Sequence, residues 1–375
     1  MSARFEGRKM RAAVMRVPGE LLVVEEVEIA EPGPGEVLVR MVASGVCHSD
    51  LHALKGEWEM GLPLILGHEG SGVVEAIGEG VKRVAVGDRV VLNWTAGCGS
   101  CFYCLIGQPH LCEHLLETTH QNVMFDGTTR LRRDGEPIYS FLGVASFGEY
   151  AVVPESGAVA IGDGIALDLA SVVGCAVATG FGAASKTVRV PVGASVAIVG
   201  LGGIGLAILQ GCVAQSAGSV IAIAVHDDKL TLAKDLGATH LINARADDPI
   251  AGVHDLTGGR GVDFAFEAIG LKATIEQVLA MLGRRGTAVL VGMPPEGTLF
   301  EADPLTMTAF EQRIVGSNYG STNAAVDFPR LAELAERGHI DLASMVTRRI
   351  KLDQINDAFA AMERGEGIRT VITYD

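Results

Sequence analysis

Residues 195–210 read SVAIVGLGGIGLAILQ, and this stretch decides the fold of the second half of the chain. Residues 196–199 are typical of a buried strand, and the apolar run after Gly205 has helical spacing. Between them, GLGGIG at residues 200–205 matches G-x-G-x-x-G. Glycines at these positions let the backbone approach a pyrophosphate at the positive end of a helix. We therefore predict a dinucleotide-binding turn, the alternative being a tight turn of purely structural value.

The same alternation of strand and helix continues after this turn. SVIAIAV at 219–225 and DDKLTLAKDLGA at 227–238 read as a second strand and helix, and further strands are expected at 263–268 and 287–292. Such βαβ units predict an α/β fold with a doubly wound parallel sheet. The chain up to Tyr150 instead has short β-rich runs separated by Gly/Pro turns, which indicates an irregular, mostly β domain. The last fifty residues contain helical stretches at 328–337 and 352–364 and a closing strand.

Composition narrows the class of protein. The 375 residues include 30 Lys and Arg against 45 Asp and Glu, a net charge of −15, which argues against a nucleic-acid partner. Without a secretion signal or 18 consecutive apolar residues, we expect a cytoplasmic protein with no membrane segment. Seven cysteines do not fit a disulfide framework, and four of them fall within fifteen residues, which indicates a metal site.

Cys98, Cys101, Cys104 and Cys112 form that cluster. Four thiolates on one loop can close around a tetrahedral Zn²⁺ and leave no open position, so the site is predicted to be structural. The alternatives are four thiols without a metal and an iron–sulfur cluster, whose fourth cysteine comes three residues after the third and precedes a proline. Here the gap is seven residues and Glu113 follows, which favours zinc.

The other three cysteines differ in their surroundings. Cys212 lies mid-helix among apolar residues and is predicted to be core. Cys47 lies in GVCHSDLH, Cys175 in VGCA, and His68 between them in LGHEG. Each of these three residues alone could simply pack in the core. Only their combination indicates a functional site.

The motifs together resemble the zinc-dependent alcohol dehydrogenases of the medium-chain dehydrogenase/reductase superfamily. The resemblance rests on GVCHSDLH, LGHEGSGVV, the four-cysteine loop, GCAVATGFGAA, VGLGGIGL and IRTVITYD, in that order from about Met10 onward. It implies a GroES-like, mostly β catalytic domain at 1–178 and 323–375 that holds both zinc sites. It also implies a Rossmann-type coenzyme domain at 179–322, with the active site in the cleft.

Matched residue by residue, the resemblance makes Cys47, His68 and Cys175 the ligands of a catalytic zinc with one open position, the known Cys₂His set of alcohol dehydrogenases. Asp50 would orient the His68 ring, and Glu69 would lie beside the metal. Ser49 would contact the substrate oxygen and His52 would end the proton relay.

The resemblance also assigns the cofactor contacts. NAD(H) or NADP(H) would contact Thr179 near the nicotinamide, His48 and Arg369 at the pyrophosphate, and Lys229 at the adenosine ribose. The glycine turn and one later strand end would complete the site with Gly200, Gly202, Gly203, Ile204, Gly205 and Val291. Where a ribose-binding acid is expected, the strand ends in Ala224, with His226 and Asp227 following. Ala224 and His226 favour NADP and Asp227 favours NAD, so the preference stays open.

Two further features bear on the substrate. Residues 115–119 lack the arginine that formaldehyde-type relatives use for an anionic thiol adduct. Trp94, Phe141 and Leu142 would line an apolar pocket suited to a primary aliphatic or aromatic alcohol, although Trp94 could simply pack the domain. Tetrameric microbial members of the family have a shorter segment between Cys112 and Phe141, so the resemblance implies a homodimer, with a homotetramer as the alternative.

The sequence thus predicts an NAD(P)-dependent zinc alcohol dehydrogenase acting on a small-molecule alcohol or aldehyde. The alternatives are a thiol-adduct (formaldehyde-type) dehydrogenase, a dehydrogenase with permanently bound nicotinamide, and a zinc-stabilised binding protein without activity. The last alternative predicts a damaged catalytic set, whereas Cys47, Ser49, His52, His68 and Cys175 are all present.

Overall fold

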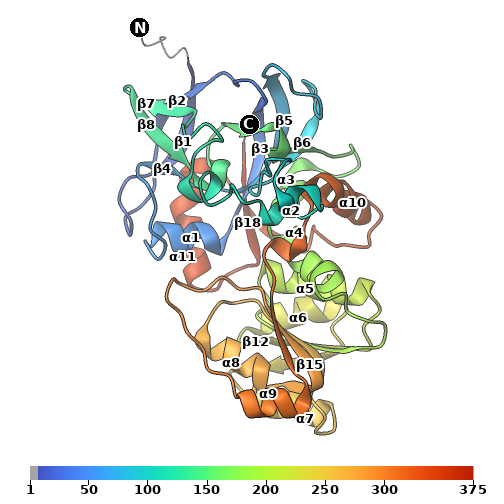
Figure 1. Cartoon of the computed structure of the whole chain (residues 1–375). Coiled ribbons are helices and arrows are strands. Elements are labelled where there is room, and N and C mark those ends of the chain that lie inside the picture. The colour runs from blue at the N-terminus through green and yellow to red at the C-terminus, as the bar shows by residue number, and fades with distance from the viewer. Residues whose placement is uncertain (1–6, 375) are drawn as a thin grey trace. The chain divides into compact units, whose positions relative to one another are not determined.

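A computed structural model describes residues 7–374. The chain divides into two compact units (Figure 1). The first unit consists of the residues up to Cys175 together with those from Asn323 onward, and the second unit is Ala176–Thr322.

The second unit is built on a six-stranded parallel sheet in the order β13-β12-β11-β14-β15-β16. This is the doubly wound order 3-2-1-4-5-6, so the predicted Rossmann-type fold is confirmed. The strands are β11 (Ser195–Val199), β12 (Ser219–Ala224), β13 (His240–Asn243), β14 (Val262–Glu267), β15 (Leu282–Leu290) and β16 (Arg313–Gly316). The helices are α4 (Ala176–Gly182), α5 (Gly203–Ala214), α6 (Asp227–Asp235), α7 (Pro249–Leu256), α8 (Lys272–Ala280) and α9 (Pro304–Phe310).

Two glycines permit the turn from β11 into α5. Gly200 has a φ of +95°, a backbone conformation that side chains rarely adopt. A Cβ on Gly205 would lie 1.8 Å from the carbonyl oxygen of Gly200. The first turn of the helix therefore lies directly against the end of the strand, as the pattern predicts.

The first unit contains a closed barrel and a second sheet. The barrel strands are β1 (Gly7–Met15), β2 (Val23–Ala30), β7 (Leu131–Arg133), β8 (Glu136–Ser140) and β4 (Leu64–Ile65). The second sheet runs in the order β10 (Ala158–Ala160), β6 (Arg89–Leu92), β5 (Glu69–Ile77), β3 (Glu36–Val46), β18 (Arg369–Thr373) and β17 (Val346–Ile350), and β9 (Tyr150–Pro154) also pairs with β3. This mostly β architecture confirms the predicted GroES-like class.

Short helices complete the first unit: α1 (His48–Leu54), α2 (Phe102–Leu105), α3 (Leu167–Ala170), α10 (Ala324–Glu336) and α11 (Ile355–Glu363). Leu51 and Leu54 of α1 share one hydrophobic core with Ile355 and Phe359 of α11 (Figure 1). Residues 36–54 and the segments from Ile355 to Thr373 are thus packed together around the strand pair β3 and β18.

The element boundaries differ from the predicted ones where local capping intervenes. The helix predicted from residue 328 begins at Ala324, because the Asp327 carboxylate accepts the N–H of Asn323 at 2.7 Å. The helix predicted from residue 352 opens with a 3₁₀ turn and becomes α-helical at Ile355.

Among residues 7–374, no single helix is both long and apolar enough to cross a membrane, while residues 167–174 and 176–187 meet the criterion only as a bent pair.

Candidate active site

The first unit brings Cys47, His68, Glu69 and Cys175 together. Cys47 follows β3 and caps α1, His68 lies between β4 and β5, and Cys175 follows a 3₁₀ turn at Ser171–Gly174. One ligand atom from each of the four residues lies within 4.8 Å of the others, and all four are buried. The predicted ligand set is therefore assembled from segments far apart in the sequence.

Asp50 fixes the geometry of this cluster. It is fully buried, and its carboxylate accepts the N–H of Cys47 at 3.0 Å and the N–H of Gly67 at 2.9 Å. It also lies 3.1 Å from Nδ1 of His68. A carboxylate only accepts, so Nδ1–H donates to it and Nε2 is left to bind a metal.

Two glycines allow the chain to approach this closely. Gly67 has a φ of +90°, and a Cβ there would lie 2.5 Å from the Phe147 ring. A Cβ on Gly45 would lie 2.1 Å from Glu69 Oε2. A larger residue at position 45 would displace Glu69, and a larger residue at position 67, directly before His68, would displace Phe147.

Electrostatics in the cluster favour a cation. The pKa of Cys47 lies well below its ordinary value because its sulfur accepts a hydrogen bond from Cys175, with Arg369 and His68 adding to the effect. Burial raises the pKa of Glu69 to about 7, despite the nearby Arg369. Within the described residues neither carboxylate oxygen of Glu69 accepts a hydrogen bond. Two sulfurs and an imidazole nitrogen around this buried charge fit Zn²⁺ with one position open to substrate.

Arg369, predicted to face a pyrophosphate, is buried in the first unit. Its Nη1 donates to the carbonyl of Val46 at 3.2 Å, and its Nη2 lies 3.3 Å from Glu69 Oε1. His48, the other predicted cationic contact, is exposed at the start of α1. The pyrophosphate role of both residues stays a prediction.

The predicted relay residues lie on α1 beside the cluster. Ser49 Oγ is 3.8 Å from the Cys47 sulfur. His52 is one helical turn further along, and its Nδ1 is hydrogen-bonded to the Glu57 carboxylate while its ring stacks on Trp58. Sequence reasoning missed these two partners. The only local signal was Gly56, which ends the helix.

Two of the predicted pocket aromatics contact His68. The Phe141 ring is fully buried and meets the His68 ring edge-on with centroids 5.6 Å apart. The Trp94 ring is also edge-on, at 6.4 Å. Both rings therefore limit the space beside the His68 imidazole.

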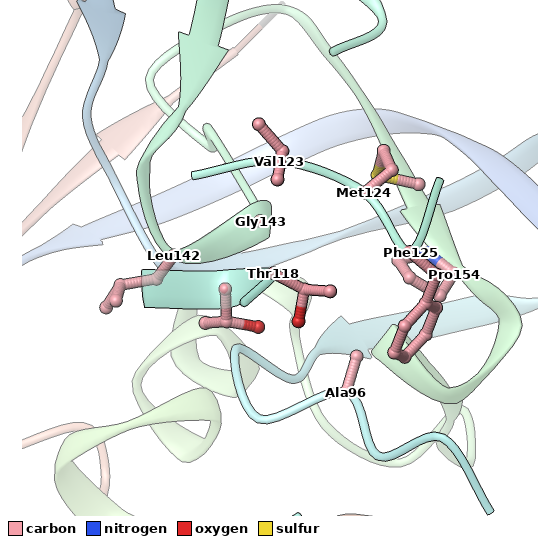
Figure 2. A pocket seen from close by; sticks show the side chains of 9 residues that line it. Ala96, Thr118, Val123, Met124, Phe125, Leu142, Gly143 and Pro154 are labelled. Atoms are coloured by element: carbon pink, nitrogen blue, oxygen red, sulfur yellow. The ribbon is translucent and has the colours of Figure 1, made fainter. Parts of the chain in front are cut away.

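Leu142 lines a small hollow in the first unit, and the sequence motifs gave no indication of this hollow. Phe125 and Pro154 lie at one end of it and Leu142 at the other (Figure 2). Its lining is uncharged: Ala96, Thr118, Thr119, Val123, Met124, Phe125, Leu142, Gly143 and Pro154. Asn122 holds the wall in place, because its Oδ1 accepts the N–H of Leu142 at 3.0 Å and both residues have positive φ.

The four-cysteine loop forms a separate cluster. The sulfur atoms of Cys98, Cys101, Cys104 and Cys112 lie within 4.8 Å of one another. Those of Cys101 and Cys112 are 3.8 Å apart, the edge of a tetrahedron with metal–sulfur bonds of about 2.3 Å. Backbone N–H groups of Ser100 and Cys101 point at the Cys98 sulfur at 3.4 Å. The loop fits the predicted structural zinc.

In the second unit, the residues predicted to hold a dinucleotide follow the C-terminal ends of parallel strands. The turn at 200–205 follows β11, Ala224 ends β12, and Val291 follows β15. Thr179 lies in α4, which packs on α5. Nothing lies within 4 Å of a Cβ built on Gly202, so the backbone there has open space beside it. These positions suit a nucleotide at the strand ends.

The predicted ribose-binding end of this site contains both basic and acidic side chains. His226 caps α6, and Lys229 in its first turn has a pKa lowered by burial. Asp227, the acid that would favour NAD, accepts a hydrogen bond from Asn243 Nδ2 at 2.6 Å. That contact holds its carboxylate at the end of β13.

Glu267 is a buried acid that sequence reasoning missed. Its carboxylate accepts the N–H of Ile269 and Gly270 at 2.9 Å and the Thr274 hydroxyl at 2.7 Å. Its backbone carbonyl accepts the N–H of Val291 at 2.9 Å. Glu267 thereby ties together the ends of β14 and β15 and the start of α8.

Comparison with known proteins gives consistent matches over nearly the whole chain. Residues 33–163 match the family described as alcohol dehydrogenase GroES-like domain, and residues 203–337 match zinc-binding dehydrogenase. An S-(hydroxymethyl)glutathione dehydrogenase of Escherichia coli O1:K1 is 40% identical over 98% of this chain and 100% of that protein. An alcohol dehydrogenase zinc-binding domain protein of Burkholderia ambifaria superposes with a TM-score of 0.94 at 35% identity, over 99% of this chain and 100% of that one. Benzyl alcohol dehydrogenase of Acinetobacter calcoaceticus gives 0.93 at 31%, over 98% and 100%.

Proposed function

The chain belongs to the zinc-dependent alcohol dehydrogenases of the medium-chain dehydrogenase/reductase superfamily, and we propose that it interconverts a primary alcohol and its aldehyde. Members of this family are oxidoreductases that use zinc and NAD(P). Within it, the proposed substrate is an uncharged alcohol, aromatic or of medium chain length, and Cys47, His68 and Cys175 are the proposed catalytic zinc ligands.

One observation carries the proposal: Cys47, His68 and Cys175 converge in a buried cluster whose imidazole is oriented by Asp50. When bound there, Zn²⁺ would supply Lewis acidity to an alcohol or carbonyl oxygen, and NAD(P)⁺ would supply the hydride acceptor for alcohol oxidation. Residues of the chain orient the ligands and balance the charge of the cluster. Asp50 holds the His68 ring, and the buried Glu69 and Arg369 balance the charge around the cluster.

Proton transfer is the task we assign to α1. The Ser49 hydroxyl lies beside the cluster and would accept the alcohol proton. His52, three residues further on the same helical face, would carry that proton outward, since its side chain is 20% exposed.

The uncharged hollow supports the choice of substrate. Its lining includes Leu142, and its other walls are apolar side chains and two threonines. Such a surface suits a hydrocarbon or aromatic substituent better than a thiol adduct with ionised carboxylates. A structural neighbour of 31% identity is a benzyl alcohol dehydrogenase, which points the same way.

A second candidate is oxidation of a thiol–formaldehyde adduct. It is favoured by the 40% identity with S-(hydroxymethyl)glutathione dehydrogenase. That relationship covers the whole chain, whereas the hollow contains Leu142, one of the residues that we propose to line the substrate pocket. We therefore rank the adduct second.

Absorbance at 340 nm separates the candidates. The panel is ethanol, hexanol, benzyl alcohol and formaldehyde with glutathione, each with NAD⁺ and NADP⁺, and with and without a zinc chelator. We expect chelator-sensitive reduction that is fastest with hexanol or benzyl alcohol. Reduction only with formaldehyde plus glutathione would replace the proposal by the second candidate. No reduction with any pair would contradict both.

We also propose a homo-oligomer, a dimer rather than a tetramer, located in the cytoplasm. A reducing compartment suits seven cysteines that are all free thiols in the structure. Light scattering on the eluting protein gives the subunit number.

A further inference from the structure

Helix α1 ends in a way that returns the chain over His52. The N–H of Gly56 donates to the carbonyl of Ala53 at 3.0 Å, and the N–H of Glu57 donates to the carbonyl of His52 at 3.0 Å. Gly56 itself has a φ of +72°. This is the Schellman arrangement, in which the second residue past the helix lies against the third residue from its end. Glu57 is therefore placed beside His52 by the backbone alone.

The side chains make use of that placement. A Schellman end usually pairs two apolar residues, but here a carboxylate meets an imidazole. Nδ1 of His52 is hydrogen-bonded to Oε2 of Glu57. The Trp58 ring stacks on the imidazole, with centroids 5.1 Å apart and planes 29° from parallel. The histidine is held at one nitrogen and on one face.

The hydrogen bond selects a tautomer. An ionised carboxylate has no proton to donate, so Nδ1 of His52 must be the donor. In the neutral ring the lone pair then lies on Nε2, which is the only nitrogen able to accept a proton. With the opposite tautomer, Nε2 would already carry a hydrogen and could not take one from Ser49.

We propose that Glu57 is a positioning residue that holds His52 as the Nδ1–H tautomer, so that Nε2 is the proton-accepting atom of the relay. The proposal rests on the function proposed above, in which His52 exports the alcohol proton. Trp58 assists by limiting rotation of the ring. Glu57 acts only through His52, and no group is transferred to it.

The first test measures the tautomer. Long-range ¹H–¹⁵N spectra of protein with ¹⁵N-labelled histidine, recorded at a pH where imidazole is neutral, distinguish Nδ1–H from Nε2–H. His52 is assigned by the signal lost in H52N. We expect Nδ1–H in the unmodified protein and in E57Q, whose amide oxygen still accepts, and a shift toward Nε2–H in E57A. An Nε2–H ring in the unmodified protein, or no change in E57A, would overturn the proposal.

The second test asks whether the tautomer matters for turnover. We expect E57A to lower kcat by about 10- to 100-fold, the range typical when the partner that orients a functional histidine is lost, with KM for the alcohol unchanged. E57Q should recover most of that loss. E59Q, which changes an exposed carboxylate two residues away, is the matched control and should keep the full rate. Equal losses in E57Q and E57A would contradict a role through the hydrogen-bond acceptor.

The two tests distinguish failure of the proposed function from failure of the role proposed for Glu57. If no alcohol is oxidised by the unmodified protein, the proposed function fails, yet the spectra still decide whether Glu57 selects the tautomer. If alcohols are oxidised and E57A keeps full kcat, the proposed function stands and the role of Glu57 is refuted.

Discussion

The two cysteine clusters of the first unit bring their ligand atoms equally close, but they are supported differently. Cys47 and Cys175 are held by the ends of β3 and of a buried 3₁₀ turn, within the packed sheet. The four-cysteine lobe has only a four-residue helix and a three-residue 3₁₀ turn, and its core consists of Cys101, Cys112 and Leu115. The fold holds the first cluster, whereas the second must be held by its metal.

The largest effect is expected from Cys47→Ala, which removes one sulfur from the first cluster. We expect turnover to fall roughly a thousandfold or more, because Lewis-acid catalysis contributes several kcal/mol. Zinc content should fall from two ions per chain to one, with the fold unchanged. Elemental analysis, circular dichroism and the 340 nm assay measure these quantities. Retained turnover would refute the assignment of the catalytic ligands.

Cys112→Ala tests the other cluster. Because structural zinc contributes directly to folding, loss of this ligand should destabilise the lobe by several kcal/mol. We expect one zinc per chain and rapid proteolysis between residues 95 and 115, while the rest of the first unit resists the protease. A cleavage pattern identical to that of the unmodified protein would show that the lobe folds without its metal.

A smaller effect is expected from Asp50→Asn, which leaves all ligands in place. An asparagine offers one acceptor oxygen where the carboxylate serves Cys47, Gly67 and His68. Zinc affinity of the catalytic cluster should fall about 10- to 100-fold. Competition with a chromogenic chelator measures this change. Glu113→Gln, beside the other cluster, is the control and should leave both affinities unchanged.

Thiol reactivity after metal removal gives the mildest test. We expect the four loop cysteines to react with a chromogenic disulfide roughly tenfold faster than Cys47, Cys175 and Cys212, because local opening of a small lobe needs less energy than opening of a sheet. Mass spectrometry of the labelled peptides identifies the order. Uniform labelling of all seven thiols would remove the distinction between the clusters.

The same comparison shows what could be predicted from sequence. The loop cluster is local, so its spacing alone indicated a tetrahedral site, and the glycine turn was equally readable because strand, turn and helix are contiguous. Cys47, His68 and Cys175 are far apart in sequence, and only the resemblance to a family joined them. The doubly wound sheet followed from periodicity, while the barrel strands β4, β7 and β8 were too short for their pairing to be predicted.

Residues that act through tertiary contacts were missed for a physical reason. Asn122 lies twenty residues from Leu142, and the function of its amide depends on a left-handed backbone at both positions. Glu57 reads as one more charge on a polar loop until Gly56 turns it back onto His52. The Asn122 contact has no signature in spacing or composition, and the Glu57 contact has only Gly56 as a local signal.

The place of β18 in its sheet has a consequence for how the protein is made. This strand lies between β3 and β17, and it carries Arg369 to Glu69. During synthesis the second unit, with all six of its strands, leaves the ribosome before residues 369–373 exist. Until then, the second sheet of the first unit lacks the strand that pairs with β3 on this side. The nascent chain should thus complete its second unit first, and the surroundings of the cluster of Cys47, His68, Glu69 and Cys175 should be completed only when the final strand arrives.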